Sequence, residues 1–157
     1  AYIAPAYAEN IPDFDLVLLT GIRSMAYHHS RFRNHGWARK LQDAPELRIN
    51  PATAQRLGIG RDDWAWVETA SKTGRVLLKA LITDEVPEDI VATGMGWWFP
   101  EKPGPDHGAL VFNVDVAIPY GPPWDPISGS PEARNVACRV TRALPSDVPA
   151  ATQGAAR

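Results

Sequence analysis

The sequence contains a single cysteine, Cys138. One thiol cannot form an internal disulfide, and it cannot by itself hold a structural zinc ion or an iron–sulfur cluster. Its apolar neighbours Val136, Ala137 and Val140 predict a small buried side chain on a strand. We therefore expect Cys138 to serve packing and not to ligate a metal.

Histidine motifs for metal binding are also missing. None of the four histidines has the H-E-x-x-H or H-x-x-E-H spacing of zinc enzymes. His28 and His29 are adjacent, so on a strand their rings would point apart. No G-x-S-x-G sequence supports a hydrolase nucleophile. We expect no metal ion held by this chain's own side chains and no catalytic residue among them.

Long apolar runs are absent as well. No window approaches the ~20 apolar residues of a membrane span, so we expect none in this chain. The N-terminus lacks the layout of a signal peptide, and the sequence leaves the compartment unknown. Sixteen basic and 18 acidic residues give a net charge of -2, which offers no reason to expect nucleic acid as a partner. Any anion-binding site must be local.

The 157 residues, 45% of them hydrophobic, suit one domain, which we place at residues 1–144. Residues 145–157 are rich in Ala, Pro and Ser and predict a disordered tail. Fifteen prolines and 12 glycines argue against a helical bundle and favour a mainly β domain. We expect strands at 16–19, 47–49, 64–70, 75–83, 90–93, 110–116 and 135–141.

One or two short helices are predicted between these strands. Residues 34–44 are ambiguous, whereas Asn50-Pro51 is a strong helix start because Asn caps well and Pro suits the first helical position. Gly58 would end that helix in a left-handed conformation. So many short strands favour a closed barrel, since an open sheet would leave unprotected edges.

Residues 20–33, TGIRSMAYHHSRFR, are dense in hydrogen-bond donors. A Thr-Gly turn after a strand frees backbone N–H groups, and arginines, histidines and a serine follow closely, which is typical of an anion-binding loop. The alternative is a solvated basic loop. In residues 94–101, GMGWWFPE, the paired tryptophans Trp97 and Trp98 either anchor the loop by burial or line a ligand site.

Residues 45–60, PELRINPATAQRLGIG, together with residues 63–82 carry a family resemblance. They resemble the C-terminal molybdopterin-dinucleotide-binding domain of the dimethyl-sulfoxide-reductase-type molybdenum/tungsten oxidoreductase family, in which an Asn-Pro-capped helix and a Gly-Arg-Val hairpin occur in this order. The resemblance covers roughly residues 16–142. It implies a double-psi β-barrel with one or two short helices.

The resemblance also implies a set of cofactor-binding residues. Ile22 interrupts the family's Thr-Gly-Arg pattern by one residue, and which of the two adjacent histidines faces the ligand stays open. The implied residues are Thr20, Gly21, Arg23, His28, His29, Ser30, Asn113 and Arg134, with Asp125, Pro126 and Ser128 in a nearby Asp-Pro-x-Ser run. We expect Thr20, Arg23, His29, Asn113 and Arg134 to line one concave face.

The implied ligand is molybdopterin guanine dinucleotide in its bis form, with molybdenum or tungsten held by pterin dithiolenes and by a side chain from another domain. The chain would then be the C-terminal domain or small subunit of an oxidoreductase, with the remaining domains or a large subunit as its partner. The alternative function is a non-catalytic double-psi barrel that serves as a protein-interaction or substrate-recognition module.

Overall fold

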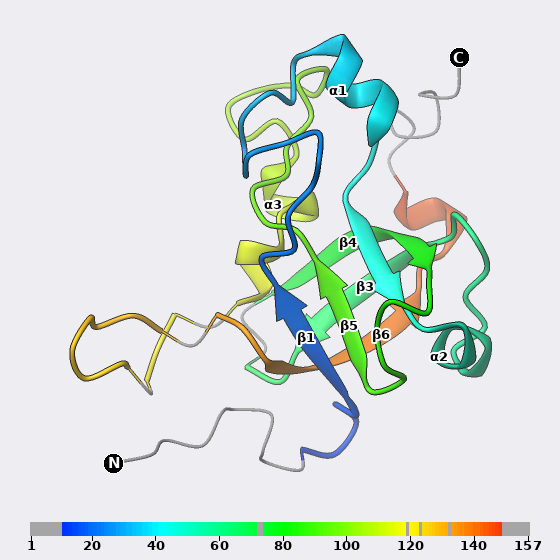
Figure 1. The fold of residues 1–157 in the computed structure, drawn as a ribbon, viewed down its shortest axis with the longest axis vertical. Coiled ribbons are helices and arrows are strands. Elements are labelled where there is room, and N and C mark those ends of the chain that lie inside the picture. The colour runs from blue at the N-terminus through cyan, green and yellow to red at the C-terminus, as the bar shows by residue number, and fades with distance from the viewer. Residues whose placement is uncertain (1–10, 72–73, 119, 123, 132, 149–157) are drawn as a thin grey trace.

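Alternating burial along short apolar segments builds a closed β-barrel. The structure, a computed structural model, describes residues 11–71, 74–118, 120–122, 124–131 and 133–148. Within these residues six strands pair in the ring order β1-β5-β2-β4-β3-β6 (Figure 1). They are β1 (Leu16–Thr20), β2 (Glu46–Ile49), β3 (Trp64–Thr69), β4 (Arg75–Ile82), β5 (Ile90–Thr93) and β6 (Val136–Arg142). Every second residue of β1 and β3 is buried, as expected for strands with one face on a core.

Parallel and antiparallel pairs are combined in the ring. Strands β1 and β5 are parallel, as are β2 and β4, and the other four pairs are antiparallel. β3 and β4 form the predicted hairpin, with Glu68 opposite Arg75, although the turn residues 72–73 lie outside the described residues. The mainly β class and the double-psi β-barrel predicted from the sequence are confirmed.

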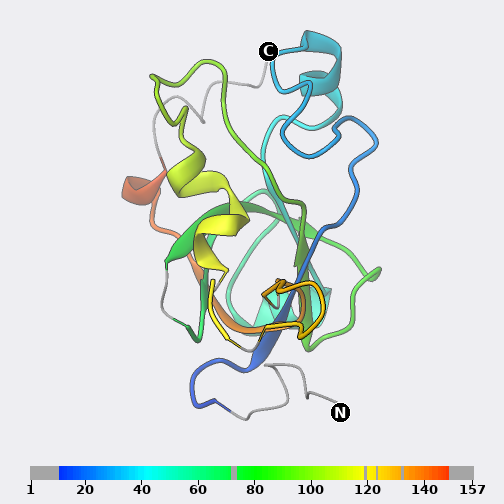
Figure 2. The ribbon, with the colours of Figure 1, turned by 90° about the vertical axis from the view of Figure 1, so that its left-hand side faces the viewer.

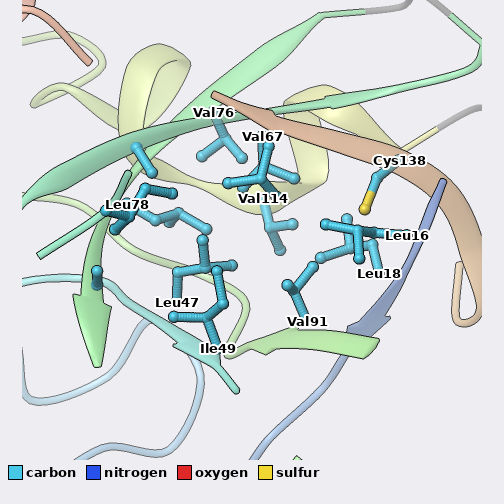
Figure 3. Packing of buried hydrophobic residues seen from close by; sticks show 14 of the residues in the cluster. Leu16, Leu18, Leu47, Ile49, Val67, Val76, Leu78, Val91, Val114 and Cys138 are labelled. Carbon is cyan, nitrogen blue, oxygen red and sulfur yellow. The ribbon is translucent and has the colours of Figure 1, made fainter. Parts of the chain in front are cut away.

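The barrel interior is a continuous apolar core. Figure 3 shows strand side chains converging there, and the labelled residues are at most 1% exposed: Leu16, Leu18, Leu47, Ile49, Val67, Val76, Leu78, Val91, Val114 and Cys138. Burial raises the pKa of the Cys138 thiol, because the thiolate would lose its hydration. The predicted packing role of Cys138 is confirmed, and its thiol is held in the unreactive protonated form.

Helix α2 (Pro51–Arg56) begins as the sequence predicts. The Asn50 side chain accepts a hydrogen bond from the Ala52 amide at 3.0 Å, and Pro51 occupies the first helical position. Gly58 follows with φ +66°, the left-handed conformation expected after a helix end. Helix α1 (Gly36–Leu41) lies within the ambiguous stretch 34–44.

The strand predicted at residues 110–116 is wrong. This segment forms helix α3 (Ala109–Phe112) and a 3₁₀ helix, η2 (Val114–Ala117), which lie against β4 (Figures 1 and 2). Phe112 and Val114 are both buried, but in different clusters, so their spacing of two imitates a strand. Asn113 separates them and caps η2 by accepting from the Asp115 amide. The ring is closed and offers no free edge for another strand.

A short helix follows the expected end of the domain at residue 144. A 3₁₀ helix, η3 (Pro145–Asp147), follows β6, and the Asp147 carboxylate accepts hydrogen bonds from the Trp66 indole at 3.1 Å and the Leu144 amide at 2.9 Å. The rest of the predicted tail, residues 149–157, lies outside the described residues. In the part of the chain that the structure describes, no helix is long and apolar enough to cross a membrane.

We predict that Leu47→Ala lowers the free energy of unfolding of this chain by about 2–5 kcal/mol, because it opens a cavity in the closed core. Leu144→Ala is the matched control, since Leu144 is 64% exposed and its replacement should change the free energy by less than ~0.5 kcal/mol. Urea unfolding of both variants measures the difference. Equal effects of the two substitutions would contradict the core described above.

Candidate functional site

Two long loops meet at one end of the barrel. Because β1 and β5 are parallel neighbours, the segments that follow them, residues 21–35 and 94–108, leave the barrel at the same end, near α1 (Figure 1). The Ile22 amide donates to the Thr93 carbonyl at 3.3 Å. Farther out, the Trp98 indole donates to the Ser30 carbonyl at 2.8 Å. The fold therefore joins the predicted basic loop to the tryptophan-bearing segment.

A glycine, Gly96, permits this close approach. Gly96 has φ +77°, and a Cβ there would lie only 2.8 Å from the Ser30 amide nitrogen, so a side chain would push the loops apart. Gly21 has φ +85°, and a Cβ there would lie 3.7 Å from Met95 Cε and 3.8 Å from Arg134 Nε. Arg134 thus lies beside Gly21, although the two are distant in the sequence.

Arg23 and His29 form a pair within the basic loop. The Arg23 guanidinium donates to His29 Nε2 at 2.7 Å. Because guanidinium has only donors, Nε2 must be the accepting nitrogen, which places the proton of a neutral His29 on Nδ1. The two histidines lie in a loop, as the sequence predicts: His29 has φ +52° in a turn, and its ring lies 4.9 Å from the His28 ring instead of pointing away from it.

A hollow adjoins the pair. It consists of a cavity of about 190 Å³ and a smaller one of about 30 Å³, which share Arg23 and Glu46 among their lining residues. His29 lines the smaller cavity, whereas His28 is exposed and lines neither. Burial raises the pKa of Glu46, because the ionised carboxylate loses hydration there. The hollow thus carries cationic donors together with one acidic group.

The other predicted residues are distributed around this hollow. Thr20 is 4% exposed and its hydroxyl donates to the Ala133 carbonyl at 2.5 Å, so it fixes the chain next to Arg134. The Asn113 side-chain oxygen accepts from the Gly96 amide at 2.9 Å. Ser30 is exposed and contributes its carbonyl to the contact between the loops. Of the five residues expected on one concave face, Arg23 and His29 line the hollow, whereas Thr20, Asn113 and Arg134 line neither of its two cavities.

The Asp-Pro-x-Ser run forms a local turn. The Asp125 carboxylate accepts from the Ile127 amide at 3.1 Å and from the Ser128 amide at 2.6 Å, and these bonds lower the pKa of Asp125. The segment around it extends away from the barrel (Figure 1), and Asp125 lines neither cavity of the hollow.

Of the paired tryptophans, Trp97 both anchors its loop and lines the smaller cavity, whereas Trp98 lines neither cavity of the hollow. Trp97 is 2% exposed and packs edge-on against Tyr27 and Phe99, so it anchors its loop. Trp98 is partly exposed, and its ring lies 5.7 Å from that of His107.

Sequence reasoning counted Arg33 only as one donor among many and did not foresee its burial. The burial depends on Tyr27 and Trp97 together, which no local pattern reveals.

Two further observations concern the described residues away from the hollow. Among the described residues, no group of three or more His, Cys, Asp or Glu side chains is placed to bind a metal ion. A separate cavity of about 400 Å³ lies beside η3, and none of the predicted site residues lines it.

Known proteins with similar sequences carry the same domain. The family model of the molydopterin dinucleotide binding domain matches residues 16–137. A dopamine dehydroxylase of Eggerthella lenta is 32% identical over 145 residues, which are 92% of this chain and 14% of that protein. An acetylene hydratase of Syntrophotalea acetylenica is 30% identical over 128 residues, which are 78% of this chain and 17% of that protein.

A solved structure agrees with these matches. Acetylene hydratase from Pelobacter acetylenicus superposes with a TM-score of 0.82 at 25% identity, over 91% of this chain and 21% of that one. This chain thus spans only a small part of the length of such relatives. The chain belongs to the molybdopterin-dinucleotide-binding domain family of the dimethyl-sulfoxide-reductase-type molybdenum and tungsten oxidoreductases.

Proposed function

We propose that the hollow where residues 21–35 meet residues 94–108 holds part of the molybdopterin guanine dinucleotide that this domain family binds. The observation that carries the proposal is the convergence of Gly21, Arg23, His29 and Arg134, from two distant segments, at one end of the barrel. Arginine forks and free backbone amides suit phosphate oxygens. The half-buried Glu46 carboxylate beside them suits the N–H edge of a pterin or guanine ring.

The predicted residues take different roles in this proposal. Arg23 and Arg134 supply charge, and His29 orients the Arg23 guanidinium by accepting from it. Thr20 and Asn113 act indirectly, as positioning residues, because their side chains bind backbone groups of the segments that carry Arg134 and Gly96. His28 and Ser30 are exposed on the loop. They would contact the ligand only if the rest of the enzyme holds part of it against this side of the loop.

The chain would work as the C-terminal domain or small subunit of a molybdenum or tungsten oxidoreductase. The cofactor supplies the redox chemistry when bound, and this chain binds and orients it while another domain provides the metal ligand. Large exposed apolar side chains beside the hollow support a partner that covers it: Met25 is 99% exposed and Leu41 68%, and both line the 190 Å³ cavity of the hollow. This partner would be the remaining domains or the large subunit of the enzyme.

The alternative function is a barrel that only binds proteins or substrates. The exposed apolar side chains would suit it equally well. It does not explain why the Arg23 guanidinium, held by His29, lines the hollow.

Arg23→Ala should reduce the cofactor content of the complete enzyme by roughly tenfold or more, because a charge-assisted hydrogen bond to a phosphate is lost. Guanine nucleotide released by acid, counted per polypeptide, gives the content. Arg23 is exposed, so the variant should remain folded. Arg61→Ala, at an exposed arginine that lines neither cavity of the hollow, is the matched control. Normal loading of the Arg23 variant would refute the proposed role.

Glu46→Gln should stabilise the protein above neutral pH. Because burial raises the folded-state pKa of Glu46, its ionised form destabilises the fold at high pH, and that penalty disappears as the pH falls toward the unfolded value of about 4.3. The thermal midpoint should therefore rise by a few degrees at about pH 8 and by less at about pH 4.5.

The same midpoints of a Glu88→Gln variant provide the control, because Glu88 is exposed on the loop before β5. A gain in the Glu46 variant that stays constant from high to low pH would show that its ionisation is not the cause.

A further inference from the structure

Arg33 is a buried arginine held between two aromatic rings. It is only 4% exposed, and its guanidinium carbon lies 3.8 Å from the centroid of Tyr27 and 3.8 Å from the centroid of Trp97. One nitrogen, Nη2, donates to the His29 carbonyl at 2.9 Å. Among the described residues, Nε and Nη1 have no hydrogen-bond partner. The rings accommodate the charge, but they leave two strong donors without acceptors.

No carboxylate of the described residues neutralises this charge through an ion pair. Burial lowers the pKa of Arg33 to about 10, so the guanidinium is still protonated at neutral pH. The nearby Arg39 adds a second positive charge and is itself paired with Glu101 at 2.8 Å. The Tyr27 hydroxyl donates to the Gln42 carbonyl at 2.7 Å, and the face of its ring lies against the Arg33 guanidinium.

Unsatisfied donors are concentrated in this region. Besides the two nitrogens of Arg33, Nη1 of Arg39 and the indole nitrogen of Trp97 are buried without an acceptor in the described part of the chain. All four atoms are donors. Arg33 and Trp97 both line the smaller cavity, together with Arg23 and His29. A buried polar cluster with an excess of donors is costly unless a ligand or water supplies acceptors.

We propose that Arg33 is a further ligand-binding residue of this site, which donates from Nε and Nη1 to an anionic or carbonyl oxygen of the bound dinucleotide cofactor. The inference rests on the proposed function and adds a contact that the sequence resemblance does not include. Through Nη2, the same side chain fixes the His29 carbonyl and so holds the histidine that orients Arg23. Arg33 would thus bind the ligand from the inner wall of the hollow, and Arg23 from its exposed rim.

The test compares two variants of the complete enzyme, Arg33→Met and Arg33→Lys. Methionine keeps much of the apolar volume and removes the charge, whereas lysine keeps the charge and loses the planar fork. We expect both to lower acid-released guanine nucleotide per polypeptide by tenfold or more, on the order expected for hydrogen bonds to a charged group. Arg31→Met, at an exposed arginine of the same loop, is the control and should load normally.

Stability of the cofactor-free enzyme separates binding from a purely structural role. Thermal midpoints are measured on enzyme produced in cells that cannot make the cofactor. If Arg33 serves the ligand, Arg33→Met leaves this midpoint unchanged or raises it, because an unpaired buried charge is removed. A fall in the midpoint that accompanies lost loading, with both restored in Arg33→Lys, would overturn the proposal, as would normal loading of Arg33→Met.

Two further outcomes are distinguishable from these. If inorganic phosphate alone raises the midpoint of the cofactor-free enzyme in an Arg33-dependent way while loading of the Arg33 variants is normal, the site belongs to free oxyanions and the cofactor contact is refuted. If Arg23→Ala loads normally while both Arg33 variants do not, the inference about Arg33 holds and the proposed role of Arg23 fails.

Discussion

The parallel pairing of β1 with β5 is the constraint on which the rest of the site depends. Parallel neighbours deliver the segments after them to the same end of the barrel, whereas an antiparallel pair would send them to opposite ends. Residues 21–35 and 94–108 therefore meet, and Gly96 allows contact at backbone distance. The burial of Arg33 follows from this meeting, because its guanidinium lies between Tyr27 of one segment and Trp97 of the other.

Elements whose signals lie in neighbouring residues could be predicted from the sequence. The alternation of side chains along residues 64–70 predicts β3, and Asn50-Pro51 predicts the start of α2, because both signals depend only on neighbouring residues. Residues 110–116 could not be predicted in this way, since Phe112 and Val114 are buried in separate clusters that exist only after the chain has folded. The family resemblance directed attention to Thr20 and Asn113, but only the structure shows that their side chains bind backbone groups.

The barrel interior and its loop-bearing end differ in how completely their buried groups are satisfied. Apolar packing is complete inside the barrel, where the strand side chains are almost fully excluded from solvent. At the loop-bearing end, by contrast, four buried donor atoms have no partner among the described residues, and large apolar side chains such as Met25 are exposed. Groups that are poorly satisfied in one domain are compatible with stability when a ligand and neighbouring domains complete them.

The closure of the ring has a consequence for the order in which the domain can assemble. Leu16 at the start of β1 lies opposite Cys138 in β6, so the seam that completes the barrel joins the first strand of the described chain to its last. On a ribosome, β1 and the loop that follows it must wait for almost the entire domain to emerge before they gain this neighbour. The site that we propose at residues 21–35 is therefore completed late in the synthesis of the domain.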